Sequence, residues 1–184
     1  IVLTPDVRDA DIAQTLFKDL EHASLIGEMP ARDPSSAVVQ INEWVGDPAL
    51  VAKGLNGVIM QKLIRTLCSK CRQAYRPNPT FLKKVGLADD LKVLYRKPKL
   101  EEDEPEPDTC GKCEDVGYFG QVSMFELLEM TDEMRALIAT KPDASAIRAQ
   151  ARKEKMLTVQ QDALRLVAEG KTSLEEVQRV FKAT

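Results

Sequence analysis

Cys68-Ser69-Lys70-Cys71 and Cys110-Gly111-Lys112-Cys113, separated by 38 residues, contain all four cysteines of this 184-residue chain. A CxxC turn brings two thiolates to one metal ion, and a second turn completes a tetrahedron without a histidine. The spacing therefore predicts that Cys68, Cys71, Cys110 and Cys113 bind one zinc ion and close the segment between them into a metal lobe.

Two redox dithiols, or pairing by chance, are the alternative interpretation of the four cysteines. Paired spacing seldom arises by accident, and the chain shows no mark of secretion, the setting in which disulfides persist. Four sulfur ligands also leave no coordination position for water. A zinc ion at this site would therefore stabilise structure and carry out no hydrolysis.

Length and composition bound the class of protein. With 43% apolar and 30% charged residues, the chain can bury a core and form one or two compact units. A net charge of -3 and only 5% aromatic residues disfavour nucleic-acid binding. The sequence has no signal peptide, no apolar run of about 20 residues and no lipidation motif. We therefore expect a cytoplasmic protein.

Three segments follow one another along the chain. Residues 1–66 alternate predicted strands and helices in a βαβ rhythm, residues 67–120 form the metal lobe, and residues 121–184 are predicted to be a small all-α unit. The expected elements of the first segment are a strand at 2–4, a helix at 9–20, a strand at 25–27, a helix at 35–44 and a helix from Asp47-Pro48 to about Thr66.

The helical segment is predicted from its start signals. The run from Met124 to Leu128 is expected to lead into a helix that begins at Thr131, and Asp143 is expected to cap the next. Ser173 and Glu176 have the spacing of a capping box for the last helix. We interpret the apolar stripes of these helices as core.

The metal lobe also contains an acidic run broken by prolines, residues 101–108. A run of this composition is typical of a solvated linker. Docking of a basic partner is the functional alternative.

The cysteine pairs stand within a longer ordered pattern. Its parts are Gln61-Lys62-Leu63-Ile64-Arg65-Thr66-Leu67-Cys68-Ser69-Lys70-Cys71, the acidic run, Cys110-Gly111-Lys112-Cys113, Gly117-Tyr118-Phe119-Gly120-Gln121-Val122-Ser123-Met124-Phe125-Glu126-Leu127-Leu128 and Gly170-Lys171-Thr172-Ser173-Leu174-Glu175-Glu176-Val177. This pattern closely resembles the C-terminal part of the type II secretion and type IV pilus assembly ATPases, whose members typically end with Gly-x-Thr-Ser-Leu-Glu-Glu-Val. The resemblance covers almost the whole chain and is weaker before Pro34. The four-cysteine insertion points to the secretion and pilus-extension branch, because the retraction motors usually lack it.

The resemblance implies an α/β fold in which the C-terminal portion of a RecA-like core is followed by a four-cysteine zinc lobe and a small all-α C-terminal domain. It implies a hexameric ring on the cytoplasmic face of the bacterial inner membrane, where ATP hydrolysis drives pilus or pseudopilus assembly through a platform membrane protein. ATP and magnesium would be cofactors of a longer protein, because this sequence contains no GxxxxGK[ST] phosphate loop. We therefore expect the phosphate loop, the acidic box and the Walker B segment upstream of Ile1, and no catalytic residue in this chain.

One departure from the family concerns its His box, which has the form Thr-Leu-His-Thr-Asn-Asp. Matching its last aspartate to Asp33 places Pro30 at the histidine and Gln40 at the arginine that usually follows. Proline cannot donate a hydrogen bond or shuttle a proton, and glutamine removes a cation that would face phosphate or a neighbouring subunit. Arg32 could replace one phosphate contact, because a guanidinium suits phosphate. We interpret His22, the only histidine, as an ordinary surface or core residue.

Because the His box departs from the family, one interpretation of the chain is a divergent paralogue with weak ATP hydrolysis. Two other functions are the alternatives. A non-enzymatic, zinc-stabilised scaffold from the same family is favoured by the missing His box. A nucleic-acid-binding zinc ribbon is opposed by the negative charge and the few aromatic residues. Sequence upstream of Ile1 would separate motor from scaffold, since intact phosphate-loop and Walker B motifs indicate a motor and degenerate ones a scaffold.

Overall fold

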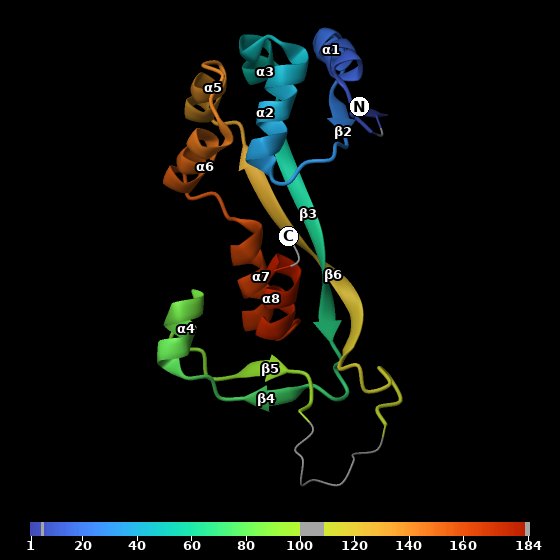
Figure 1. Cartoon of the computed structure of the whole chain (residues 1–184), viewed down its shortest axis with the longest axis vertical. Helices are drawn as coiled ribbons and strands as arrows, with labels where there is room; N and C mark the ends of the chain where they lie inside the picture. Colours follow the sequence, from blue (N-terminus) through green and yellow to red (C-terminus); the bar gives the residue numbers. More distant parts are fainter. Residues whose placement is uncertain (5, 100–108, 183–184) are drawn as a thin grey trace. The chain divides into compact units, whose positions relative to one another are not determined.

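The computed structural model of the chain describes residues 1–4, 6–99 and 109–182 and combines helices with strands in a mixed α/β fold (Figure 1). The acidic run predicted to be a linker, residues 101–108, lies outside the described residues. The chain divides into two compact units. The first unit comprises Ile1–Met60 and Glu126–Leu157, and the second unit comprises Gln61–Phe125 and Thr158–Thr184.

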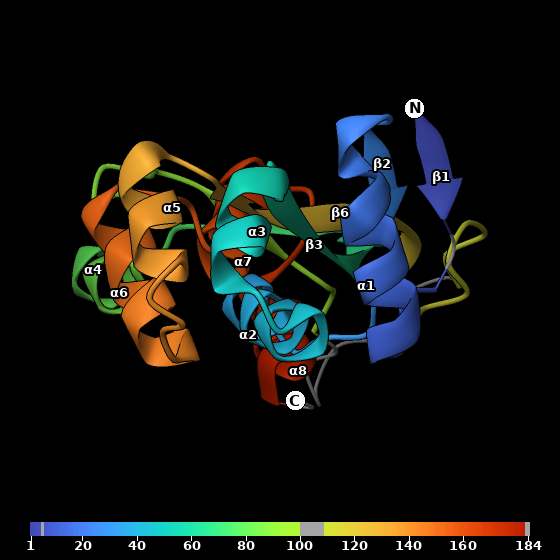
Figure 2. The ribbon, with the colours of Figure 1, turned by 90° about the horizontal axis from the view of Figure 1, so that it is seen from above.

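The first unit begins with the predicted βαβ arrangement. Strand β1 (Val2–Thr4) pairs in parallel with β2 (Leu25–Gly27), and helix α1 (Ala10–Lys18) followed by the 3-10 turn η1 (Asp19–Glu21) connects them. The carboxylate of Asp9 accepts the N–H of Ile12 at 2.9 Å and caps α1. The βαβ prediction is confirmed, and Figure 2 shows α1 beside the β1–β2 pair.

Two Asp-Pro steps start the next two helices, α2 (Pro34–Val45) and α3 (Pro48–Gly54). Asp33 and Asp47 accept backbone N–H groups of the first turns, and the proline after each has no N–H to leave unpaired. Gly46 ends α2 with a φ of 75°, a left-handed conformation that glycine adopts without strain. Both predicted helix starts are confirmed.

The prediction that the second of these helices continues to Thr66 is wrong. Helix α3 ends at Gly54, and residues Gly57–Leu67 form strand β3. The side chains of β3 alternate between exposed and less exposed, as in Ile59 and Met60, and this period of two belongs to a strand. Gly54 is the last residue of α3 and Gly57 is the first residue of β3, so the two glycines flank the change from helix to strand.

Strand β6 (Tyr118–Glu129) pairs with β3 in a two-stranded sheet and runs in the opposite direction in Figure 1. The predicted all-α segment from residue 121 is therefore wrong over 121–129. Met124 and Leu128 are buried whereas Phe125 and Leu127 are exposed, so this apolar run alternates with the strand period.

The rest of the first unit comprises helices α5 (Asp132–Ile138) and α6 (Ala144–Lys153), with the predicted caps at Thr131 and Asp143. The guanidinium of Arg135 donates to the carbonyls of Ala52 and Leu55 and satisfies the C-terminal end of α3. The core of this unit consists of Val38, Ile41, Val51, Ala52, Leu128, Met130, Met134, Ile138 and Ile147.

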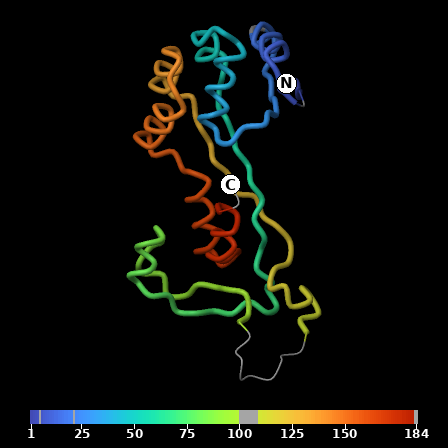
Figure 3. The backbone as a smooth tube through the Cα atoms, viewed as in Figure 1, coloured from blue at the N-terminus to red at the C-terminus, as the bar shows by residue number. Residues whose placement is uncertain are grey.

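The second unit contains the cysteine pairs. Its elements are β4 (Gln73–Tyr75) paired antiparallel with β5 (Leu94–Arg96), and helices α4 (Pro79–Val85), α7 (Val159–Ala168) and α8 (Leu174–Lys182). Helices α7 and α8 pack on one another across a short connection (Figure 3). Buried members of this unit include Ile64, Leu82, Leu94, Leu166 and Val167.

The predicted helical segment is thus shared between the units. Helices α5 and α6 belong to the first unit, and α7 and α8 belong to the second. A separate all-α C-terminal domain is not confirmed, and the division into 1–66, 67–120 and 121–184 stays a prediction. Within the described ranges, none of the helices has the length and apolar content needed to cross a bilayer.

Candidate metal centre

The four cysteine sulfurs converge on one point in the second unit. All four lie within 4.8 Å of one another, with 3.9 Å between Cys68 and Cys110 and 3.5 Å between Cys71 and Cys113. Four thiolates at about 2.3 Å from a tetrahedral zinc ion lie about 3.8 Å apart. The cysteines are free thiols, so they could hold a metal ion in this geometry.

Backbone hydrogen bonds shape the two CxxC turns. The N–H of Arg72 donates to the carbonyl of Cys68 at 3.0 Å, and the N–H of Glu114 donates to that of Cys110 at 2.9 Å. A bond of 2.9 Å from the N–H of Cys68 to the carbonyl of Gly117 joins the first turn to the chain that leaves the second. These backbone hydrogen bonds therefore hold both turns in place and join them to one another.

Side chains also connect the two turns. The ammonium of Lys112 donates to the hydroxyl of Ser69 at 2.9 Å and so links the two turns, while within the second turn Asp115 accepts the N–H of Cys110 at 2.8 Å. Glu114 and Asp115 both have positive φ values, 50° and 63°, which turn the chain sharply after the second pair.

Two of the four thiols have lowered pKa values, and the other two have raised pKa values. The N–H groups of Lys112 and Cys113 favour the thiolate of Cys110 and lower its pKa to about 6. Burial raises the pKa of Cys68, but N–H groups from its own turn bring it below the ordinary value. Burial raises the pKa of both Cys71 and Cys113. A dication held by all four sulfurs would keep every thiol ionised.

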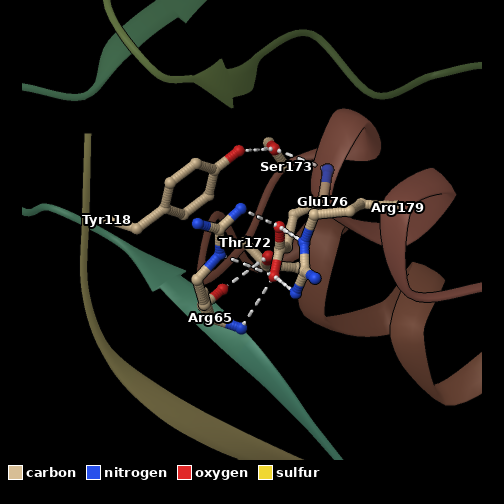
Figure 4. Close-up of polar contacts among 6 residues, drawn as sticks. All are labelled: Arg65, Tyr118, Thr172, Ser173, Glu176 and Arg179. Atoms are coloured by element: carbon tan, nitrogen blue, oxygen red, sulfur yellow. Dashed lines mark hydrogen bonds and ion pairs between the residues drawn. The ribbon is translucent and has the colours of Figure 1, made fainter. Parts of the chain in front are cut away.

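A second polar cluster of this unit, shown in Figure 4, consists of Arg65, Tyr118, Thr172, Ser173, Glu176 and Arg179. Glu176 is buried, and its carboxylate accepts Nε of Arg65 on β3 at 2.9 Å and Nε of Arg179 on α8 at 2.7 Å. The Arg65 guanidinium also lies 4.4 Å from the centre of the Tyr118 ring, whose hydroxyl is 2.6 Å from that of Ser173. Burial raises the pKa of Glu176, but the bonds from Arg179 and Arg65 outweigh it and lower the pKa to about 2.

Acid is expected to destabilise the second unit through this carboxyl. Because the folded pKa of about 2 lies below the ordinary 4.5, the contribution of Glu176 is present above about pH 5 and is lost as the pH falls towards 2. Chemical denaturation between pH 7 and pH 2.5 should show a smaller acid-induced loss of unfolding free energy in Glu176→Gln than in wild type. Glu175→Gln, the exposed neighbour, serves as the control; equal pH slopes in Glu176→Gln and wild type would contradict the assignment.

The His-box positions lie in the first unit. Pro30 is exposed in the connection between β2 and α2, and Gln40 lies half-buried in α2. Arg32 is exposed with its Nε 3.6 Å from Asp33, and Arg148 of α6 lies 3.2 Å from the same carboxylate. Burial raises the pKa of Asp33, but the bonds from Ser36 and, to a smaller extent, the two arginines outweigh it and hold the pKa below its usual value. Asp33 therefore fixes the start of α2.

His22 is exposed at the end of η1, where its N–H donates to the carbonyl of Asp19. The ordinary role expected for His22 stays a prediction.

Sequence reasoning missed the Arg65–Glu176–Arg179 cluster, because Ser173 and Glu176 were interpreted as a capping box. Ser173 does accept the N–H of Glu176 at 3.2 Å, while the carboxylate binds the arginines. Arg179 three residues after Glu176 was the available signal.

Comparison with known proteins gives a consistent result. Residues 1–179 match the family model described as type II/IV secretion system protein. A type II secretion system protein E from Dickeya dadantii is 32% identical over 183 residues, which are 99% of this chain and 34% of that protein. A type IV pilus assembly ATPase PilB from Thermus thermophilus is 28% identical over 181 residues, which are 96% of this chain and 19% of that protein.

Among solved structures, the X-ray structure of the Legionella pneumophila ATPase DotB matches 99% of this chain and 38% of its own, with a TM-score of 0.60 at 12% identity. This likeness shows the fold alone. The chain spans about a third of the length of the type II relative and about a fifth of that of PilB. The resemblance seen in the sequence is confirmed by the match over 1–179, and the chain belongs to the type II/IV secretion system protein family.

Proposed function

We propose that this chain is the C-terminal portion of an ATPase that powers type II secretion or type IV pilus assembly, and that its four cysteines hold a structural zinc ion. The observation that carries the proposal is the cluster of four sulfurs within 4.8 Å of one another, inside a family match that spans residues 1–179. The relatives named as type II secretion protein E and as type IV pilus assembly ATPase support the same class of machine.

The proposed zinc ion has a structural role. Cys68, Cys71, Cys110 and Cys113 would fill all four positions of a tetrahedron, which leaves none for water or substrate. When bound, the ion would supply a cross-link between the end of β3 and the start of β6. The 38 residues between the pairs, including β4, α4 and β5, would then be a closed lobe.

The activity proposed for the longer protein rests on relatives. ATP and magnesium would bind elements upstream of this chain, and copies would assemble into a hexameric ring. Its partners would be the inner-membrane platform protein and other cytoplasmic components of the machine, with the ring peripheral to the bacterial inner membrane. Nucleic acid is not among the proposed partners, because the chain is acidic and poor in aromatic residues.

The chain by itself is expected to show only background ATP hydrolysis. The sequence has no phosphate loop to cradle the phosphates and no Walker B carboxylate to hold magnesium. The measurement is phosphate release by the zinc-loaded 184-residue chain, compared with the longer protein at equal molar concentration. Turnover by the short chain that persists through repurification would place the active site here and contradict the proposal.

A scaffold without hydrolysis is the second candidate function, and the observation that favours it is Pro30 and Gln40 at the positions of the family's histidine and arginine. Measurements on the longer protein separate the motor from the scaffold. A motor hydrolyses ATP and carries intact upstream motifs, whereas a scaffold keeps the zinc site and the family fold with degenerate motifs.

A further inference from the structure

We propose that residues Gly170–Glu176, here called the clasp, hold the two CxxC turns in the geometry that binds metal. This inference rests on the proposed zinc centre. The clasp lies about 100 residues from Cys68 in the sequence and contains no metal-ligating cysteine. It nevertheless hydrogen-bonds the chain on the flanks of both turns.

The first contact fixes the entry to Cys68. The N–H of Leu67 donates to the carbonyl of Lys171 at 2.8 Å, and the hydroxyl of Thr172 donates to the carbonyl of Arg65 at 2.8 Å. The end of β3 is therefore hydrogen-bonded to the clasp at two residues, through the N–H of Leu67 and the carbonyl of Arg65. Cys68 follows directly, so its Cα position is set by these bonds.

The second contact fixes the exit from the first turn. Arg72, immediately after Cys71, donates from its guanidinium to the carbonyl of Gly170 at 2.6 Å and lies 4.2 Å from the centre of the Tyr95 ring. Gly170 has a φ of 70°, and a Cβ there would lie 2.7 Å from the Tyr95 ring. Only glycine allows this approach.

The third contact reaches the chain that follows the second turn. The hydroxyls of Tyr118 and Ser173 lie 2.6 Å apart, and Tyr118 follows Gly117, whose carbonyl accepts the N–H of Cys68. A bond to Tyr118 therefore restrains both turns, because Gly117 joins them. The positions of these side chains are shown in Figure 4.

Burial makes these contacts strong restraints. Thr172, Ser173 and Glu176 are each at most 1% exposed, so water does not compete for their hydrogen bonds. Glu176 anchors the clasp from its other end by binding the guanidinium of Arg65 and that of Arg179. The hydroxyl of Thr172 and the carboxylate of Glu176 thus act on the same residue of β3.

Groups that orient metal ligands typically change metal affinity by about 10- to 100-fold when removed. Thr172→Val keeps the shape of the side chain and removes its hydroxyl, and Tyr118→Phe removes the hydroxyl that meets Ser173. We expect each to raise the zinc Kd about 10-fold and the double variant about 100-fold. Thr172→Ser keeps the hydroxyl and is expected to bind zinc like wild type.

The measurement is competition for zinc against a chelator of known affinity, on chains whose folding is checked by circular dichroism. Cobalt(II) titration adds a spectroscopic signature, since the absorption of a tetrahedral thiolate site should be reduced or shifted in Thr172→Val and restored in Thr172→Ser. Thr140→Val is the matched control, because the Thr140 hydroxyl also donates to a backbone carbonyl, at 2.7 Å, but in the first unit.

If the clasp promotes zinc binding, thermodynamic linkage requires that zinc binding also stabilises the clasp. Zinc should slow amide hydrogen exchange at residues 172–179 in wild type and less so in Thr172→Val. A wild-type chain that binds no zinc contradicts the metal centre and the clasp together. Zinc binding by wild type, with an equal Kd in Thr172→Val and Tyr118→Phe, overturns the clasp alone.

Discussion

The Cys110→Ser variant is expected to lose the zinc ion that the wild-type chain retains. Wild type should contain about one zinc ion per chain, and the variant close to none after dialysis against a chelator. A serine hydroxyl is not ionised near neutral pH and is a far weaker zinc ligand than the Cys110 thiolate, whose pKa is lowered to about 6 by backbone N–H groups of its turn. Because metal-binding free energy is folding free energy in such sites, the lobe should also loosen.

Elemental analysis gives the zinc content of the Cys110→Ser chain, and limited proteolysis between residues 72 and 99 reports on the β4, α4 and β5 part of the lobe. Ser69→Ala is the control, because it removes the contact with Lys112 and leaves all four sulfurs in place. A wild-type chain reconstituted with zinc should resist cleavage, whereas the reconstituted variant should not. Four sulfurs found far apart, or joined in disulfides, would contradict the zinc centre.

The double substitution Pro30→His with Gln40→Arg, made in the longer protein, is expected to raise the rate of ATP turnover by about 10²- to 10³-fold. Removing one preorganised contact to the charge that develops in the transition state typically lowers the rate by this factor. Nucleotide affinity should change little, because phosphate loop and magnesium would be held upstream. Pro30 is exposed just before the Asp33 cap of α2, so a histidine there can be accommodated without entering the core.

Steady-state kinetics of the longer protein separate kcat from KM in this experiment. Arg32→Ala tests the rival explanation that this exposed cation already supplies the missing charge. The divergent-motor interpretation fails if the wild-type protein turns over ATP as fast as ordinary relatives and Arg32→Ala has no effect. Loss of turnover in Arg32→Ala would instead assign the phosphate contact to Arg32.

Local signals in the sequence predicted those parts of the fold that depend on neighbouring residues. Asp47, Thr131 and Asp143, the start signals that the sequence offered, each cap the helix that follows. The CxxC spacing likewise predicted the convergence of four sulfurs, because each turn fixes its own pair and only one arrangement lets both pairs share an ion.

Strands β3 and β6 were missed because their pairing partner lies about 60 residues away in the sequence. The apolar residues of Met124–Leu128 fit a short helix as well as a strand when taken alone, and the pairing with β3 decides between them. Glu176 was misread for a similar reason, since its partner Arg65 lies on a distant strand. A single sequence does not show which residues come together over such separations.

The connectivity of the two units has a consequence for biosynthesis. Val38 and Val51 leave the ribosome long before Leu128 and Ile147, on which they pack in the core of the first unit. At translation speeds of about 5–20 residues per second, a nascent chain would present this apolar surface for roughly 5–20 s. Thr172, whose hydroxyl bonds the chain just before Cys68, is synthesised after both cysteine pairs. Chaperone protection during translation would therefore matter more for this chain than for one whose domains are contiguous.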